Sequence, residues 1–298
     1  MDTGGAPGCA DPPACTTGCV SCVTAGLPTN NVGQPAWHPG GRYLVVQAEK
    51  QTHPGLPCGA GTHPGAGVYN DLWSIDTQTL SAVRIVDLPT DPNRGILHPH
   101  FSADGAQLSW SEMIEGASAT DGEEFGIWEL KVADVAIESG QVALSNIRTF
   151  TPNGRRWYEN HGFSPDGQRV IFTSSEPDLP VNLATNIYTM TVATGAIADK
   201  LTTTAYNEHA IFSPDGEHVI WMSGDNVFVA TDWWVMNADG SDKRQLTRLS
   251  DPASDHYQGT NTIAADFAWG DDSRILGYAH SAGLFPFFER IYLLELEL

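Results

Sequence analysis

Histidines recur a few residues before an aromatic residue in different parts of this sequence. His98 and His100 stand three residues and one residue before Phe101, and His209 stands three residues before Phe212. Divalent transition metals bind neutral imidazole nitrogens well, and a neighbouring carboxylate balances the charge of the ion. The spacing His98-x-His100 also places two rings on the same side of a strand, which suits chelation. This pattern predicts a site for one divalent transition metal ion of the manganese or zinc type.

Eight residues make up the predicted metal site. The predicted metal ligands are His98, His100, His161 and His209. The residues predicted to act as further ligands, or to orient the ligands through hydrogen bonds, are Glu159, Glu208, Asp266 and Gln34. The alternative is a purely structural role, in which these side chains bond to neighbouring strands and to channel water where apolar packing is thin.

An internal repeat indicates which elements must carry these residues. An aromatic residue followed by a turn similar to Ser-Pro-Asp-Gly occurs in five segments, which are 35–41, 100–105, 162–167, 211–216 and 268–272. A bulky residue, such as Phe172 or Trp221, stands nine positions after each aromatic residue in a run typical of a β-strand. A third strand-like run recurs in all five units, and a fourth recurs in the first four. Each unit therefore predicts one blade of a β-propeller.

The repeat predicts an all-β fold with one domain, a five-bladed β-propeller of four-stranded antiparallel blades. The predicted blades are residues 33–90, 91–152, 153–204, 205–258 and 259–298. Because the last unit ends after its third strand, we expect residues 19–24 to supply its fourth strand and close the ring. Residues 1–32 would then form a cysteine-rich tail with the closing strand, and residues 33–298 the propeller. The alternatives are that the chain is part of a larger propeller or that the tail is disordered.

The same topology predicts a binding face. In a propeller blade, the first strand starts on the face that also carries the loop between the second and third strands, and several of these loops are long here. Long loops on a rigid scaffold are where binding sites are usually built. The candidates for ligand contacts at this rim are Trp157, Tyr158, His256, Tyr257, His53 and His63.

Five cysteines, four of them within the first 22 residues, favour an oxidising environment. The disulfide candidates are Cys9, Cys15, Cys19, Cys22 and Cys58. One alternative for the first four is a zinc site, which would require four thiolates and a reducing compartment. Another is the cluster-binding motif of radical enzymes that use S-adenosylmethionine. The spacing Cys15-x3-Cys19-x2-Cys22 matches that motif, although no alternating strand and helix barrel follows it.

Charge and hydropathy limit the partners and the location. The net charge of −21 repels phosphate backbones and anionic membrane surfaces, which excludes nucleic-acid binding through a basic face. No apolar run approaches the roughly 18 residues of a membrane span. Residues 1–5 lack the basic and apolar regions of a signal peptide, so we expect that any export signal was removed or was never there. We predict a periplasmic or extracellular protein without membrane insertion.

The turns at 163–167 and 212–216, together with the strand-like runs 187–190 and 235–247, resemble the repeats of TolB-type propellers. The resemblance covers residues 33–298 and implies a propeller fold. The first and fifth units depart from it, because their turns lack the full motif. Similar repeats occur in periplasmic binding proteins, in accessory domains of peptidases and in some lyases, so the fold does not determine the function.

Two kinds of function remain open. The leading prediction is an exported, non-catalytic propeller that binds a protein, a peptide or a glycan through its loop face and its histidine-rich channel mouth. Such a protein would act alone or as a subunit of a larger surface assembly. The alternative is a metal-dependent polysaccharide lyase or a related enzyme, because the His98-x-His100 pair is similar to the manganese-binding pair of oligogalacturonate lyases. Those lyases carry a glutamine three residues before the pair, where Gly95 stands here. Serine-hydrolase chemistry is not expected, because the Gly-x-Ser-x-Gly motif is absent.

Overall fold

The computed structural model describes residues 23–24, 26–29, 31–53, 66–116, 125–176, 184–203, 205–224, 229–271, 273–282 and 289–296. Within these ranges the chain forms β-strands joined by turns and contains no helix. The predicted all-β fold is therefore confirmed. The residues outside these ranges include most of the predicted closing strand, together with His63 and the five cysteines Cys9, Cys15, Cys19, Cys22 and Cys58.

Nineteen strands follow one another along the described chain. The first eight are β1 (Val32–Trp37), β2 (Tyr43–Glu49), β3 (Asn70–Asp76), β4 (Ala82–Val86), β5 (Gly95–Phe101), β6 (Gln107–Glu115), β7 (Ile127–Glu138) and β8 (Gln141–Phe150). The next eight are β9 (Tyr158–Phe163), β10 (Arg169–Ser175), β11 (Thr185–Thr191), β12 (Ile197–Lys200), β13 (Tyr206–Phe212), β14 (His218–Gly224), β15 (Asp232–Asn237) and β16 (Arg244–Gln245). The last three are β17 (Thr262–Trp269), β18 (Arg274–Ser281) and β19 (Glu289–Glu295).

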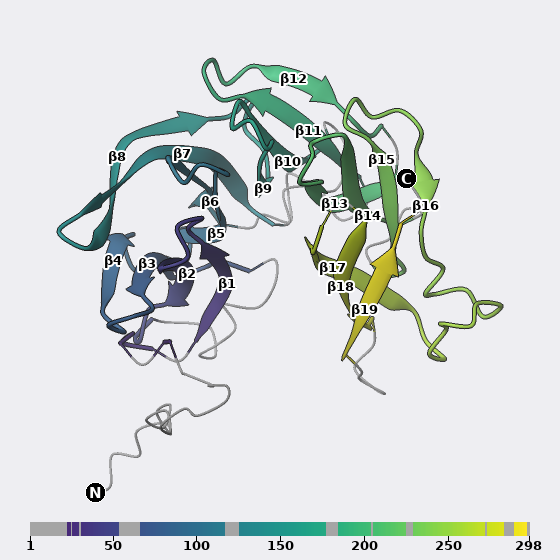
Figure 1. The fold of residues 1–298 in the computed structure, drawn as a ribbon, viewed down its shortest axis with the longest axis horizontal. Helices are drawn as coiled ribbons and strands as arrows, with labels where there is room; N and C mark the ends of the chain where they lie inside the picture. Colours follow the sequence, from purple (N-terminus) through teal and green to yellow (C-terminus); the bar gives the residue numbers. More distant parts are fainter. Residues whose placement is uncertain are drawn as a thin grey trace, which may run out of the picture.

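Consecutive strands pair into antiparallel sheets (Figure 1). Strands β1 to β4 form one sheet, and β5 to β8 form another. Strands β9 to β12 and β13 to β16 pair in the same way, and one parallel bridge between Thr185 and Tyr206 joins these two groups. Strands β17 to β19 form a three-stranded sheet, which has no fourth strand among the described residues. The groups follow the repeated units of the sequence, while the number of blades and the closure of the ring stay predictions.

The first strands of the five groups lie nearest the centre of the molecule. Strands β1, β5, β9, β13 and β17 contact one another in that order. Figure 1 shows the groups side by side around a central space, with β1 and β17 on either side of an opening. Side chains at the starts of these strands are thereby directed to one region.

Apolar side chains fill the interfaces between neighbouring groups. Val45 of β2 and Leu72 of β3 pack with Ile96 of β5 and Trp110 of β6. Similar clusters join the later groups to one another. Burying a large apolar side chain contributes about 1.5–3 kcal/mol, so these interfaces hold the first strands in place.

The Ser-Pro-Asp-Gly turns share one hydrogen-bond network. The hydroxyl of Ser164 donates to Asp166 Oδ1 at 2.6 Å and accepts from the backbone N of Arg169 at 3.0 Å. Ser102 and Ser213 make the equivalent bonds in their own turns. These bonds fix the turn between the first and second strands, so the role of the motif is structural.

The part of the chain that the structure describes has no helix that is long and apolar enough to cross a membrane.

Candidate metal centre

An irregularity in each first strand positions the polar side chains. The antiparallel register is interrupted once in each of β1, β5, β9, β13 and β17. Within these irregular segments, Gln34, His98 and His209 have φ angles of 48°, 52° and 50°. This left-handed conformation is uncommon for residues that carry a side chain. Bulges of this kind redirect side chains, and backbone strain of this kind clusters at functional sites.

His98, His161 and His209 face one another from β5, β9 and β13. The ring centroids of His98 lie 5.8 Å from those of His161 and His209, which are 5.7 Å from each other. One ring nitrogen of each histidine lies within 4.8 Å of the other two. Three of the four predicted ligands therefore form a cluster that could hold one metal ion.

Glu159 lies beside two of these rings. Its Oε1 is 3.0 Å from His98 Nε2, and its Oε2 is 3.8 Å from His161 Nε2. The side chain is 1% exposed, and Oε2 has no hydrogen-bond partner among the described residues. Burial raises the pKa of Glu159, but the charges of His98 and His209 outweigh burial and lower the pKa below its usual value. A buried anionic oxygen without a partner is costly unless a cation neutralises it.

A carboxylate from another strand orients His209. Its Nδ1 lies 2.9 Å from Oδ1 of Asp266, which belongs to β17. Because a carboxylate only accepts hydrogen bonds, Nδ1 carries the proton and Nε2 is left for another partner. Burial lowers the pKa of His209, but Asp266 and Glu159 outweigh burial and raise it to about 10. Nε2 also lies 3.9 Å from Oε2 of Glu208, whose own pKa is raised by burial and by the charge of Glu159.

His161 belongs to the same cluster of three rings, but its pKa is shifted in the opposite direction from that of His209. Burial and the neighbouring charge of His209 lower the pKa of His161 well below its usual value, so the ring is neutral. Its Nε2 lies 2.7 Å from Oγ1 of Thr173 on β10. A neutral imidazole is the form that binds a metal.

Two amide side chains hold the backbone of His98. The backbone N of His98 donates to Gln34 Oε1 at 2.8 Å, and Asn160 Nδ2 donates to the carbonyl O of His98 at 2.7 Å. The side-chain amide of Gln34 also contacts His98 Nε2. Asn160 stands three residues before the aromatic residue of its repeat, as His98 and His209 do in theirs. The structure nevertheless places His161, and not Asn160, in the irregular segment of β9.

Two cavities open onto the histidine cluster. The smaller has a volume of about 270 Å³ and lies at the starts of the first strands, where Trp157, Tyr206 and Phe125 line it together with Glu159 and Glu208. The larger has a volume of about 450 Å³ and separates β1 and β5 from β17 to β19. A ligand in either cavity can therefore reach the cluster.

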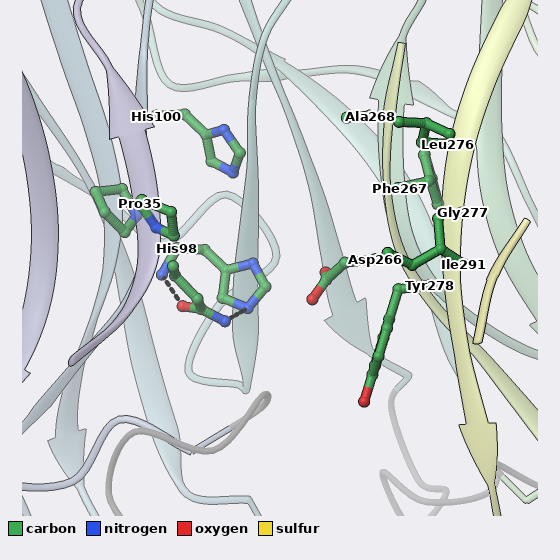
Figure 2. Close-up of a pocket in the computed structure, with 12 residues that line it drawn as sticks. Pro35, His98, His100, Asp266, Phe267, Ala268, Leu276, Gly277, Tyr278 and Ile291 are labelled. Carbon is green, nitrogen blue, oxygen red and sulfur yellow. Dashed lines mark hydrogen bonds between the residues drawn. The ribbon is translucent and has the colours of Figure 1, made fainter. Parts of the chain in front are cut away.

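His100 lines the larger cavity and lies outside the group formed by His98, His161 and His209. Burial and His98 lower the pKa of His100 to about 4, which keeps the ring neutral. Figure 2 shows His98 and His100 on one side of this cavity, and Asp266 and Tyr278 on the other.

The two residues predicted at the start of β9 have different places. Trp157 lines the smaller cavity, where its ring centroid is 5.5 Å from that of Phe125. Tyr158 is fully buried, and its hydroxyl donates to the carbonyl O of Gly154 and accepts from the backbone N of Asn153, both at 2.7 Å. Both residues pack in the same core cluster, where Trp157 is 2% exposed, although Trp157 also lines the wall of the smaller cavity.

The other predicted rim residues do not join the cluster. His53 has a side chain that is 1% exposed, bonds to Glu49 Oε1 at 2.5 Å and stacks on Tyr69. His256 makes an edge contact with Tyr292 of β19. Tyr257 lies in the turn before β17, where its backbone N donates to the carbonyl O of Ser254.

Sequence analysis missed three residues that complete the site, which are Thr173, Tyr206 and Phe125. Tyr206 stands two residues before Glu208, so the alternation of a strand places both side chains on one face. That spacing was the available signal. Thr173 comes from a neighbouring strand and Phe125 from a loop, and neither position is marked by a motif.

Solved structures with the same fold include a putative TolB from Agrobacterium tumefaciens, at a TM-score of 0.58 and 19% identity over 89% of this chain and 77% of that chain. TolB from Acinetobacter baumannii matches at a TM-score of 0.52 and 17% identity, over 89% of this chain and 54% of that chain, so this chain spans about half of the length of that TolB. An oligogalacturonate lyase in complex with manganese matches at a TM-score of 0.53 and 15% identity, over 90% of this chain and 66% of that chain. No protein-family model and no curated protein sequence matches. The fold is that of a TolB-like β-propeller, as the sequence resemblance predicted.

Proposed function

We propose that this TolB-like propeller binds one divalent transition metal ion, of the manganese or zinc kind, through His98, His161 and His209. The observation that carries the proposal is the convergence of three imidazole nitrogens within 4.8 Å of one another. Three histidines leave a position open for an exogenous ligand, as in catalytic zinc sites.

The charge around the histidines supports a cation at this point. Glu159, Glu208 and Asp266 surround three rings that are neutral when they act as ligands. The unpartnered Oε2 of Glu159 faces His161 across 3.8 Å. A divalent ion would neutralise this buried carboxylate in place of the charges of His98 and His209, which lower its pKa here. Asp266 would act as the group that orients the ligand His209.

We propose that the protein is a binding module and that the metal ion contacts its partner. A bound ion would supply a Lewis-acidic position that an oxygen or nitrogen atom of the partner can occupy. The donor belongs to a protein, peptide or glycan partner that enters the smaller cavity, where the exposed ring of Phe125 offers an aromatic surface. The five cysteines favour an oxidising environment, so we place the protein in the periplasm or outside the cell, alone or in a surface assembly. We also propose that each group of strands is one blade, five in all.

A metal-dependent lyase is the second candidate, and one observation favours it. The carboxyl group of Glu208 lines the same cavity and lies 3.9 Å from His209 Nε2, where it is placed to move a proton to or from a bound ligand. Incubation of the metal-loaded protein with acidic polysaccharides would release unsaturated products, and Glu208→Gln would stop that release. Absence of product with the loaded wild type contradicts the lyase and leaves the binding module.

Calorimetric titration of chelator-free protein with Zn²⁺ and Mn²⁺ tests the metal proposal. We expect about one equivalent to bind to the wild type, and His98→Ala with His209→Ala to abolish uptake, because two of three ligands are lost. His218→Ala is the matched control, since His218 begins β14 and is not part of the cluster. Absence of uptake by the wild type, or equal uptake by the double variant, would overturn the proposal.

A further inference from the structure

Two buried carboxyl groups lie close together at the smaller cavity. One oxygen of Glu159, one oxygen of Glu208 and a ring nitrogen of His209 all lie within 4.8 Å of one another. Glu159 is 1% exposed and Glu208 is 7% exposed, and both line the cavity of about 270 Å³. Two carboxylates at this separation repel each other unless a proton or a cation lies beside them. This wall of the cavity is therefore a place where a positive charge is stabilised.

Histidines are the charged partners of these two groups within the described residues. Glu159 pairs with His98 and His161, and Glu208 pairs with His209. In the proposed metal centre these three histidines are neutral ligands, so they no longer offset the carboxylates. The positive charge must then come from the metal ion and from whatever else binds there.

A divalent ion balances only part of the negative charge. Three carboxyl groups surround the cluster, those of Glu159, Glu208 and Asp266, so one is left for a proton or for a cationic ligand. Asp266 lines the larger cavity and is already bonded to His209. Of the two groups at the smaller cavity, Glu208 has the more accessible side chain, 9% exposed against 1% for Glu159. Glu208 is therefore the group that a ligand in the smaller cavity reaches first.

The other walls of the smaller cavity suit an organic cation. Phe125, which is 38% exposed, lines the cavity from the loop before β7, and Tyr206 lines it from the start of β13. Ammonium groups are attracted to the faces of aromatic rings as well as to carboxylates. An anionic ligand would instead bring a further negative charge beside Glu208. The lining therefore favours a cationic group over an anionic one.

Two buried polar atoms at this cavity have no hydrogen-bond partner among the described residues. They are Oε2 of Glu159, an acceptor, and Nε1 of Trp157, a donor, and both residues line the cavity. Such unsatisfied groups are uncommon in folded proteins and lower the stability of the fold. A ligand that carries an N–H donor next to a hydrogen-bond acceptor would satisfy both.

We propose that the partner of this binding module is recognised by a primary ammonium group, which enters the smaller cavity and lies between Glu208 and Glu159 beside the ring of Phe125. A volume of about 270 Å³ is below the usual range of pockets for drug-sized molecules, so it admits one side chain or one terminal residue of the partner. The ammonium group belongs to a peptide amino terminus or to a lysine side chain. This inference rests on the proposed binding function, because it names the chemistry of the partner.

Calorimetric titration with small peptides tests the ligand class. The probes are alanyl-alanine amide, which has a free amino terminus, its N-acetylated form, and N-acetyl-lysine amide. We expect at least one of the two amines to bind with a Kd below about 10 mM, and the acetylated dipeptide, which has no ammonium group, not to bind. The tighter of the two amines identifies the source of the group. Absence of binding by both amines, with and without zinc, overturns the proposal.

Glu208→Gln removes one charge and keeps the shape of the side chain. We expect this variant to bind the amine at least tenfold more weakly, because it removes a buried ionic partner of the ligand. Glu138→Gln is the matched control, since Glu138 is exposed on β7 and should bind as the wild type does. Phe125→Ala should weaken binding by about two- to fivefold, the size of an exposed cation–π contact. Equal affinities for the wild type and Glu208→Gln would contradict the proposal.

Titration with Zn²⁺ separates this inference from the metal centre. Glu208→Gln keeps all three histidines, so we expect it to take up about one equivalent of Zn²⁺, as the wild type does. Metal uptake without amine binding contradicts only the ammonium site. Amine binding that needs Glu208, in a protein that takes up no metal, contradicts only the metal centre.

Discussion

Asp266 and His209 belong to different strands, β17 and β13, yet Asp266 Oδ1 lies 2.9 Å from His209 Nδ1. This contact links the last group of strands to the histidine cluster and makes Nδ1 the donor to Asp266, so a metal ion would replace the proton on Nε2. The ring centroid of His209 lies 5.8 Å from that of His98 and 5.7 Å from that of His161. The pair has the geometry by which metal-binding histidines are usually oriented.

Asp266→Asn should weaken metal binding by about 10- to 100-fold, because loss of an orienting carboxylate has effects of this size. Calorimetric titration with Zn²⁺ measures the change. Asp271→Asn is the control, since Asp271 forms an exposed pair with Arg274. Equal affinities for the wild type and Asp266→Asn would show that Asp266 does not orient a metal ligand.

The sequence predicted the fold well because the fold repeats. The Ser-Pro-Asp-Gly turns, the aromatic residue before each turn and the strand runs after it recur with fixed spacing, and they reappear as bonded turns such as Ser164 with Asp166. Ring closure by residues 19–24 was predicted from the missing fourth strand of the last unit. It stays a prediction, because residues 19–22 lie outside the part of the chain that the structure describes.

Ser164→Ala should lower the free energy of unfolding by about 1 kcal/mol, because two hydrogen bonds of a buried hydroxyl are lost. The bond from Ser164 lowers the pKa of Asp166, so Asp166 stabilises the fold above its usual pKa of about 4 and loses this effect as the pH falls through its lowered value. The Asp166 pKa measured by NMR should therefore rise in the variant. An unchanged pKa would show that the hydroxyl bond is not formed.

Gly277→Ala should destabilise the protein by about 1–3 kcal/mol, the usual effect of overfilling a packed core. A Cβ at this position would lie 2.5 Å from the buried ring of Trp233. At Gly270, the nearest atom to an added Cβ is 3.5 Å away, so Gly270→Ala is the control. Chemical denaturation compares the two, and equal stabilities would contradict the packing of β18 on Trp233.

Gln47→Leu should leave stability unchanged or raise it by about 1 kcal/mol. Gln47 is fully buried on β2, and neither atom of its amide has a partner among the described residues. Replacing an unsatisfied amide by an apolar group of similar shape removes a desolvation cost. A loss of more than about 2 kcal/mol in thermal denaturation would mean that the amide is bonded in solution.

The candidate site was only partly predictable. His98, His161 and His209 were identified because they precede the repeated aromatic residues, and the structure brings these three together. His100, which the spacing grouped with His98, lines the larger cavity instead. The difference arises because β5 loses its register between Leu97 and His100, and sequence alternation does not reveal such a bulge.

The most direct test of the metal centre is an anomalous diffraction map from crystals of the zinc-loaded protein, collected at the zinc absorption edge. We expect one strong peak about 2.0–2.1 Å from a nitrogen of each of His98, His161 and His209, and no peak there in crystals of the His98→Ala and His209→Ala double variant. A map of the wild type without a peak among these three rings, or with zinc bound only elsewhere, would contradict the account.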